Sequence, residues 1–334
     1  MERGRGARLP KILPRKSLRM DTADLQKLAS QTRFMRETGI ALIFASGILA
    51  LFLFIPFVSK KTPSTPITIA TSTAPNAFAR VPLEAKAAIV YDLALRETLY
   101  AKNADAQLPL ASLTKLLTVY AALSELSLNT PILIPIEATR LEGSHVLSAG
   151  QTFALADLAR LTLVASLNDG AAAIAHTISS RGNRPQGEAL ASAAAALALS
   201  QTYAVNGHGL DVNTAVSGGY GSARDLARLA GALVQEAPTI AAATTRSSAQ
   251  AVSEGGTLFK VNNTDPIVGT IPGLLLSKTG YTDLAGGNLT LVFDAGIGHP
   301  IAVVVLGSSL KARFTDGTAL VAATLAHFAG VETL

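Results

Sequence analysis

The sequence predicts an α/β domain, in which helices flank one antiparallel sheet, preceded by a single transmembrane helix. Strand-like segments occur near residue 90 and again after residue 273, whereas residues 115–235 are rich in Ala and Leu with helical periodicity. A run of twenty uncharged residues, 39–58, lies upstream of both. Strands at both ends of a domain indicate one sheet that carries a large helical insertion.

The sheet is expected to have five strands. Each candidate is a short apolar run bounded by turn-forming residues, and Gly296–Pro300 is a hairpin signal between the last two. The expected strands are Ala87–Asp92, Thr98–Ala101, Gly273–Lys278, Asn288–Phe293 and Ile301–Leu306.

Helices are expected between and after these strands. One begins near Ser112 and continues through an apolar run, and the clearest helical periodicity covers 155–165. Ser222, followed three residues later by Asp225, is typical of a helix N-cap. The remaining expected helices are the Ala-rich run 191–199 and the final segment Asp316–Ala329.

The N-terminal segment differs in charge from the rest of the chain. Residues 1–38 contain ten of the 28 Lys and Arg residues but only four of the 23 acidic ones, so this tail carries +6 and the remainder −1. Residues 39–58 are long enough to cross a bilayer as a helix. Because basic flanks stay on the cytoplasmic side, we expect a basic cytoplasmic tail at 1–38 and a transmembrane helix at 39–58.

The segment after the span has linker composition. Residues 59–80 are rich in Pro, Ser and Thr, so we expect a linker there and a catalytic domain over 81–334. A cleaved signal peptide fits less well, because its apolar region is usually about 7–15 residues long.

The composition excludes several other chemistries. The chain has no cysteine, and its five histidines are scattered without metal-ligand spacing. The basic tail is better explained as the flank of a membrane span than as a nucleic-acid arm. We therefore expect no metal, no cofactor and no nucleic-acid partner.

Three short motifs carry residues suited to serine acyl transfer. Ser112 and Lys115 form Ser-x-x-Lys at an expected helix start, and their spacing places both on one helix face. Ser166 and Asn168 form Ser-x-Asn, and Lys278-Thr-Gly ends an expected strand. Because a lysine of ordinary pKa is protonated at neutral pH, we expect burial and a second cation, Lys278, to lower the pKa of Lys115.

Two further matches to these motifs lack the right context. Ser308-x-x-Lys closes an expected strand, where residues three apart point to opposite faces. Ser127-x-Asn precedes a turn at Thr130-Pro131. Neither is expected to be catalytic.

The three motifs and their flanks resemble those of D-alanyl-D-alanine carboxypeptidases, the low-molecular-mass penicillin-binding proteins that trim peptidoglycan stem peptides. The resemblance spans roughly residues 81–330 and includes Asn206–Leu210 and Lys278–Leu289. It implies a penicillin-binding protein/β-lactamase-like fold, located outside the bacterial plasma membrane. It also implies peptidoglycan stem peptides as substrates and β-lactam antibiotics as covalent inhibitors.

The expected catalytic residues are a nucleophile, its base and a proton relay. Ser112 is the nucleophile, Lys115 takes its proton, and Ser166 passes a proton to the leaving D-alanine. By resemblance, the backbone N–H groups of Ser112 and Tyr281 bind the oxyanion. The resemblance assigns substrate binding to Asn168, Lys278, Thr279, Gly280, Tyr281 and Arg313.

Two residues depart from the family pattern, and other functions stay open. Ser277 stands where glycine is usual before the lysine, and Gly170 where alanine is usual, so we expect altered local packing. A membrane-anchored β-lactamase is one alternative, although Glu188 lacks the surroundings of that enzyme's glutamate loop. A D,D-endopeptidase or transpeptidase, and a catalytically silent wall-binding module, are the others.

Overall fold

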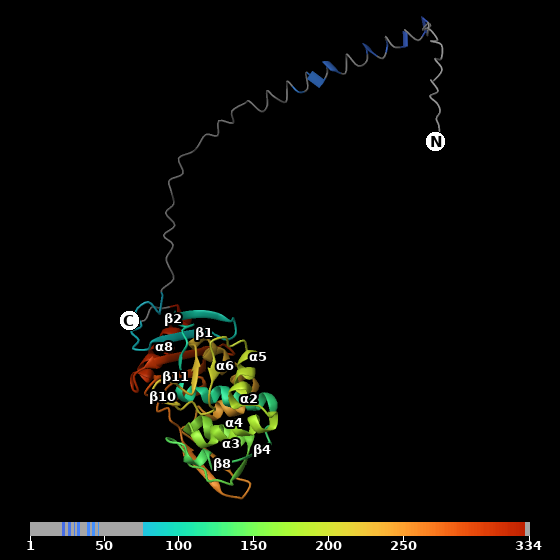
Figure 1. The fold of residues 1–334 in the computed structure, drawn as a ribbon. Helices are drawn as coiled ribbons and strands as arrows, with labels where there is room; N and C mark the ends of the chain where they lie inside the picture. Colours follow the sequence, from blue (N-terminus) through green and yellow to red (C-terminus); the bar gives the residue numbers. More distant parts are fainter. Residues whose placement is uncertain are drawn as a thin grey trace, which may run out of the picture. The chain divides into compact units, whose positions relative to one another are not determined.

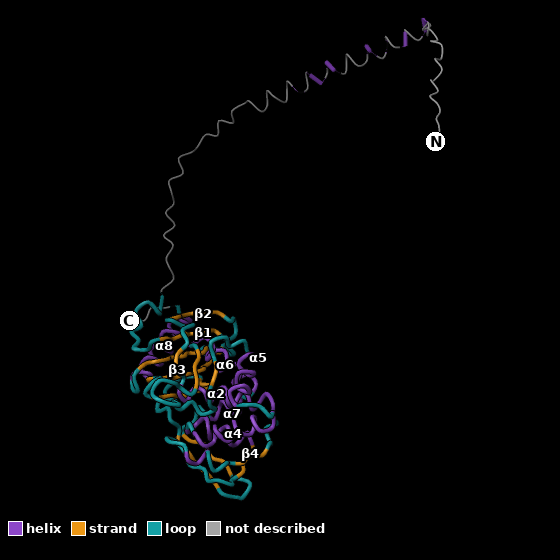
Figure 2. The backbone as a smooth tube through the Cα atoms, in the orientation of Figure 1, coloured by secondary structure: helices purple, strands orange, loops and turns teal. Residues whose placement is uncertain are grey.

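The computed structural model describes residues 76–330 and twelve separate positions between Thr22 and Ser46. The chain divides into two units, Met1–Thr71 and Ser72–Leu334, and the second contains the fold shown in Figures 1 and 2. Within the described part of the chain, no helix has the length and apolar character needed to cross a membrane. Most of the predicted tail 1–38, span 39–58 and linker 59–80 lies outside the described residues.

A five-stranded antiparallel sheet forms the centre of the domain, in the order β10-β11-β12-β1-β2 (Figure 1). All five expected strands are confirmed, and the first has the predicted bounds. The others are longer than expected, and β10 continues through the Lys-Thr-Gly motif at one edge of the sheet. The bounds are β1 Ala87–Asp92, β2 Glu97–Lys102, β10 Leu274–Thr282, β11 Gly286–Asp294 and β12 Pro300–Ser308.

Alternating side chains on these strands divide the core in two. Ile89 and Val304 face the larger core, which contains the helical insertion, whereas Val90 and Val303 face the smaller core. The smaller core packs against α8, Ala312–Ala329. Both faces of the sheet are therefore covered, as the sequence predicts.

The helical insertion contains six α-helices. Their bounds are α2 Thr114–Glu125, α3 Leu155–Ala165, α4 Asn168–Gly182, α5 Gln186–Ala196, α6 Ala223–Glu236 and α7 Pro238–Ala243. The helix predicted at 155–165 is confirmed, and the Ala-rich run forms the end of α5. The final helix begins four residues earlier than predicted, because the Ser309 side chain accepts the N–H of Ala312 at 3.1 Å.

Several short pairings were not predicted. They surround the helices and involve too few residues to show a period in the sequence. They are β3 Leu108–Pro109 with β7 Gly219–Gly221 and β6 Tyr203–Ala204, β4 Pro131–Leu133 with β5 Thr152–Ala154, and the hairpin β8 Ser248–Val252 with β9 Leu258–Asn262.

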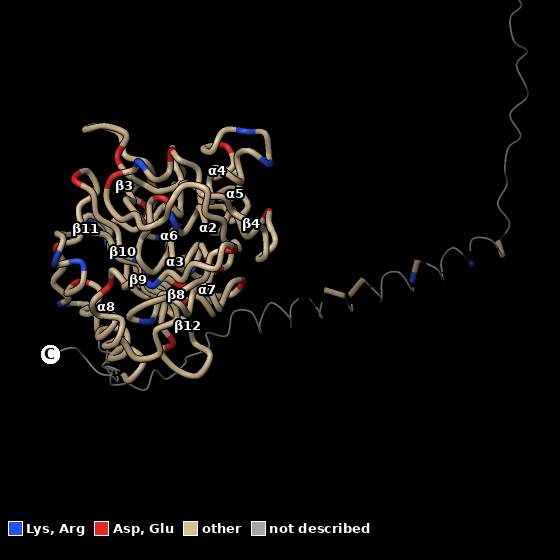
Figure 3. Tube along the Cα trace, turned by 90° about the horizontal axis from the view of Figure 1, so that it is seen from below, with Lys and Arg blue, Asp and Glu red and all other residues tan. Residues whose placement is uncertain are grey.

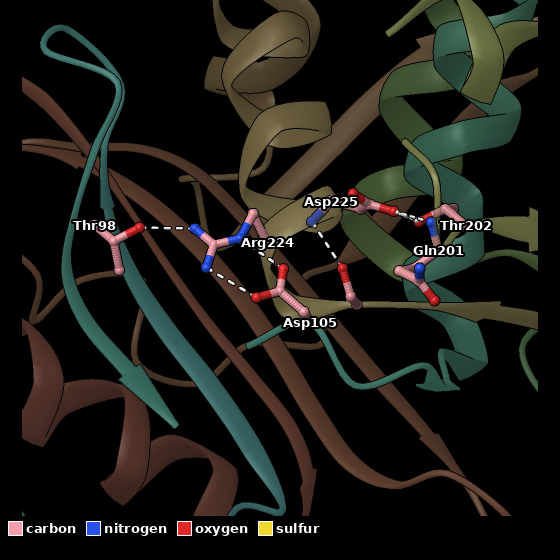
Figure 4. Close-up of polar contacts among 7 residues, drawn as sticks. Thr98, Asp105, Gln201, Thr202, Arg224 and Asp225 are labelled. Atoms are coloured by element: carbon pink, nitrogen blue, oxygen red, sulfur yellow. Dashed lines mark hydrogen bonds and ion pairs between the residues drawn. The ribbon is translucent and has the colours of Figure 1, made fainter. Parts of the chain in front are cut away.

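The predicted cap at Ser222 is confirmed, and it anchors α6 to the rest of the domain (Figure 4). The Ser222 hydroxyl accepts the N–H of Asp225 at 3.1 Å. The Asp225 carboxylate accepts a hydrogen bond from Thr202, and the neighbouring Arg224 forms an ion pair with Asp105 at 2.6 Å. The start of α6 is thereby fixed against two separate loops.

The end of the predicted linker packs onto the domain. Phe78 is buried and stacks on Tyr100 of β2, with ring centroids 5.6 Å apart. Its ring also lies 5.7 Å from that of His327 in α8. Residues 76–80 therefore belong to the compact unit rather than to a free tether. Basic and acidic residues are interspersed around this unit (Figure 3).

Candidate active site

Ser112 lies in a short 3-10 turn, Ala111–Leu113, that leads directly into α2. The α-helix itself begins at Thr114, two residues later than the serine, which corrects the expected helix start. Ala111 is buried and has a φ of 49°, a backbone conformation that is uncommon for a residue with a Cβ. The turn holds the Ser112 Oγ 2.9 Å from the Nζ of Lys115.

Lys115 is completely buried and has three polar contacts. Its Nζ lies 2.9 Å from Ser112 Oγ, 2.8 Å from Asn168 Oδ1 and 2.6 Å from the carbonyl oxygen of His208. Burial lowers the pKa of Lys115 well below its usual range, and nearby Lys278 lowers it further, whereas Asp169 acts in the opposite direction. A neutral amine has two N–H groups and one lone pair. The two oxygens that can only accept match those N–H groups, which leaves the lone pair for the Ser112 proton.

The partners of Lys115 are themselves held in place. The Asn168 Nδ2 donates to the carbonyl oxygen of Glu142 at 2.7 Å, so its Oδ1 faces the lysine. The His208 ring accepts the N–H of Leu210 through Nδ1 at 3.2 Å. Burial, followed by the charge of Lys115, lowers the pKa of His208 to about 4, so this imidazole is neutral at physiological pH. The histidines show no metal-ligand spacing in the sequence, and the role of the His208 backbone carbonyl has no side-chain signal that the sequence could reveal.

Ser166 stands at the break between two helices. It has a φ of 58° and ends α3, and α4 begins two residues later at Asn168. The break allows Ser166 and Asn168 to face the same site. The Ser166 hydroxyl lies 2.9 Å from the Nζ of Lys278, which also donates to the carbonyl oxygen of Thr279 at 2.7 Å.

Lys278 is buried on the edge strand β10. Burial lowers the pKa of Lys278 to about 7, and Arg313 lowers it while Asp265 raises it. The contact with Ser166 joins the sheet edge to the helical insertion, as the sequence predicted. Lysine and serine thus form a second pair opposite the first.

The backbone of β10 lies close to the nucleophile. A Cβ at Gly280 would lie 2.9 Å from the carbonyl oxygen of Leu110 and 3.3 Å from the backbone N of Ser112, so only glycine permits this approach. The next residue, Tyr281, has an exposed side chain at the strand's surface. The Thr279 hydroxyl is 2.7 Å from that of Thr264.

Arg313 approaches the same strand from α8. Its Nη1 donates to the carbonyl oxygen of Gly280 at 2.6 Å, and burial lowers the pKa of its guanidinium. Its Nε is buried and has no hydrogen-bond partner in the described part of the chain.

The two other motif matches lie apart from this arrangement. Ser308 donates its hydroxyl proton to Asp316 at 2.7 Å, and Lys311 is exposed. Ser127 contacts Thr130 in a loop at 3.1 Å. Neither serine has a lysine partner of the kind found at Ser112.

Gly170, one of the two departures from the family pattern, has a packing reason. A Cβ at this position would lie 2.2 Å from Thr162 Oγ1 in α3. That hydroxyl oxygen is buried without a hydrogen-bond partner among the described residues. The close contact between α3 and α4 therefore disfavours alanine here, because the Thr162 side chain would have to move.

The chain belongs to the D-alanyl-D-alanine carboxypeptidase family, whose model matches residues 71–309. It is a serine-type hydrolase of that family. It is 31% identical to the D-alanyl-D-alanine carboxypeptidase DacB2 of Mycobacterium tuberculosis over 200 residues, 59% of this chain and 66% of that protein. It is 30% identical to the D-alanyl-D-alanine endopeptidase of Pseudomonas aeruginosa over 270 residues, 76% of this chain and 83% of that protein.

Solved structures have the same fold. The ampicillin-bound penicillin-binding protein D2 of Listeria monocytogenes aligns with a TM-score of 0.62 and 28% identity, over 72% of this chain and 97% of that one. A D-alanyl-D-alanine carboxypeptidase of M. tuberculosis aligns with a TM-score of 0.64 and 25% identity, over 77% of this chain and 94% of that one. The expected penicillin-binding protein/β-lactamase-like fold is thereby confirmed.

Proposed function

We propose that this protein is a serine-type D-Ala-D-Ala carboxypeptidase that removes the terminal D-alanine from peptidoglycan stem peptides. The observation that carries the proposal is the position of the Lys115 Nζ, buried and 2.9 Å from the Ser112 Oγ. On the other side of the site, Lys278 contacts Ser166. With two lysine–serine pairs, one pair can remove the proton of the nucleophile and the other can donate a proton to the leaving group.

In the first step, Lys115 removes the Ser112 proton and the Oγ attacks the carbonyl carbon of the penultimate D-alanine. The backbone N–H groups of Ser112 and Tyr281 stabilise the oxyanion. Ser166 delivers a proton to the leaving nitrogen, and free D-alanine departs. Water then hydrolyses the ester on Ser112 and restores the enzyme.

Substrate binding uses residues of the helical insertion and residues of β10 and α8. Asn168 holds the peptide carbonyl of the stem. The terminal carboxylate is bound by Thr279 and by Arg313, which lies beside Gly280 of β10. Lys278 supplies a nearby positive charge. β-Lactams carry a carboxylate beside a reactive carbonyl, so we expect them to acylate Ser112 as covalent inhibitors.

The location of the enzyme follows from the N-terminal sequence. We propose that residues 39–58 anchor it in the bacterial plasma membrane with residues 1–38 in the cytoplasm. The catalytic domain would then face the peptidoglycan. A protease-protection assay on membrane vesicles, with tags at residue 1 and after residue 330, tests this orientation.

The activity test uses the compact unit Ser72–Leu334. It is incubated with an N-acylated peptide ending in D-Ala-D-Ala, and released D-alanine is measured by mass spectrometry. We expect release by the wild type and none by Ser112→Ala, together with labelling of only the wild type by fluorescent penicillin. Folded wild-type protein that neither labels nor releases D-alanine would instead be a silent wall-binding module.

Endopeptidase activity is the second candidate, because the Pseudomonas relative that matches 76% of this chain is named an endopeptidase. Cross-linked muropeptide dimers distinguish the two, since an endopeptidase converts them to monomers without first releasing D-alanine. Rapid β-lactam hydrolysis is not favoured. Asp169 is committed to the N–H groups of Val146 and Leu147, and Glu188 is exposed on α5.

A further inference from the structure

The segment after β9 contacts β10 at the residues directly before and after Lys278. Thr264 contacts Thr279 at 2.7 Å through their hydroxyl groups, and the next residue, Asp265, accepts the hydroxyl proton of Ser277 at 2.5 Å. Alternate residues of a strand point to the same side, so Ser277 and Thr279 meet this segment while Lys278 points away from it. The two side-chain contacts are neighbours along β10, which is an edge strand of the sheet.

Asp265 is a buried hydrogen-bond acceptor with more than one partner. It is 2% exposed, and its other carboxylate oxygen accepts the N–H of Ile267 at 2.8 Å. Ser277 is also buried, and its N–H donates to the Thr244 hydroxyl at 2.9 Å. The serine that departs from the family pattern is therefore the residue that links this carboxylate to the catalytic strand.

The site contains several basic side chains, and the negative charge of Asp265 opposes their positive charges. Lys278 interacts electrostatically with Arg313 of α8, Lys115 of α2 and Asp265 of the segment after β9, although its side chain points away from that segment. Asp265 favours the cationic forms of both Lys278 and Arg313, and Tyr281 also acts on Arg313 in that direction. Asp169 acts on Lys115 rather than on Lys278. Asp265 is thus the carboxylate that influences both cations on the side of the site that binds the substrate's carboxylate.

We propose that Asp265 is a positioning residue of this peptidase site, which fixes β10 around Lys278 through Ser277 and supplies a buried negative charge near the two cations Lys278 and Arg313. The inference rests on the proposed function. Substrate enters with a carboxylate, which needs both cations, whereas two unopposed buried cations would favour loss of the Lys278 proton.

The test is the pH dependence of kcat/KM for D-alanine release, which reports groups of the free enzyme. Wild-type kcat/KM should fall as the pH rises through about 7, where Lys278 loses its proton. A nearby opposite charge shifts a pKa by about 1–3 units. Asp265 acts on Lys278 less than burial and Arg313 do, so in Asp265→Asn this fall should occur about one pH unit lower, the lower end of that range. At pH 8 the variant should therefore be about tenfold slower than the wild type, and the ratio should approach one at low pH.

Two control variants separate charge from structure. Ser277→Ala removes the hydrogen bond to Asp265 but keeps the carboxylate. The pH at which kcat/KM falls should therefore match that of the wild type, even if kcat/KM is lower at every pH. Asp283→Asn removes an exposed carboxylate just beyond β10 and should leave the profile unchanged. Thermal melts of every variant check that each is folded.

The outcomes distinguish the inference from the function on which it rests. If the wild type releases no D-alanine and is not acylated by penicillin, the proposed function fails. If the wild type is active and kcat/KM of folded Asp265→Asn falls at the same pH as that of the wild type, only the role of Asp265 is overturned. Should Asp265→Asn not fold, Asp265→Ser is judged by the same criterion, and failure of both to fold would assign Asp265 a purely structural role and reject the proposal.

Discussion

Replacing Lys278 by methionine should stabilise the protein while abolishing activity. The pKa of Lys278 falls from 10.5 to about 7 in the folded protein, because the buried amine loses hydration and faces Arg313. At about 1.4 kcal/mol per pH unit, holding this lysine protonated destabilises the fold by about 5 kcal/mol below pH 7.

Methionine removes that cost but also two hydrogen bonds, to Ser166 and to the Thr279 carbonyl. Leaving these two acceptors without their donor costs about 1–3 kcal/mol each, so the net gain should be at most about 3 kcal/mol. For a domain of this size, that corresponds to a rise in Tm of about 6–12 °C.

The gain should depend on pH in a defined direction. Between pH 7 and 10.5 the unfolded chain binds the Lys278 proton that the folded protein has released, so wild-type stability rises with pH in this window. The advantage of Lys278→Met should therefore be largest at pH 6 and should shrink towards pH 10. Calorimetric melts at several pH values measure it, and Lys260→Met, at an exposed lysine, is the matched control. A Lys278→Met variant that is less stable than the wild type at pH 6 would refute the electrostatic reasoning.

The remaining predictions concern the nucleophile, the strand beside it and the helix pair behind it. Lys115→Ala should slow acylation by fluorescent penicillin by about 10²–10⁴-fold in folded protein, the range of a lost general base; acylation at the wild-type rate would exclude Lys115 from that role. Gly280→Ala should reduce acylation sharply while the protein still folds, since its Cβ would displace β10 from Leu110 and Ser112; labelling kinetics and Tm together check this. Gly170→Ala should lower stability by about 1–3 kcal/mol through overpacking against Thr162. Adding Thr162→Ala should recover most of that loss in denaturant unfolding, and no recovery would locate the clash elsewhere.

Local patterns were sufficient for the elements that form the frame of the site. β1 and β12 are continuous apolar runs because they are buried on both faces, and α3 has helical periodicity because it buries one side. The Ser222 cap has a fixed local spacing. Helix starts were less predictable. α8 begins at Ala312, whose N–H donates to the Ser309 hydroxyl, before the apolar pattern of the helix starts. Ser112 lies in a 3-10 turn whose positive φ at Ala111 has no residue signature.

The candidate site was predictable where its residues lie within motifs, and unpredictable where contacts join distant segments. The pairing of Lys115 with Ser112 follows from helical spacing. The carbonyl oxygen of His208 and the carboxylate of Asp265 reach the site only through the fold, across 93 residues in the first case. A backbone carbonyl has no side-chain identity that a sequence pattern could reveal.

The packing of Phe78 determines which part of the domain first resists a force applied to the N-terminal segment. Phe78 is held by Tyr100 on β2, the strand at the opposite edge of the sheet from β10. A pull on the N-terminal part of the chain is therefore resisted first at that edge and by α8, with three intervening strands between it and the lysine-bearing edge. A force applied through the N-terminal segment can thus reorient the whole domain without first separating β10 from its neighbours.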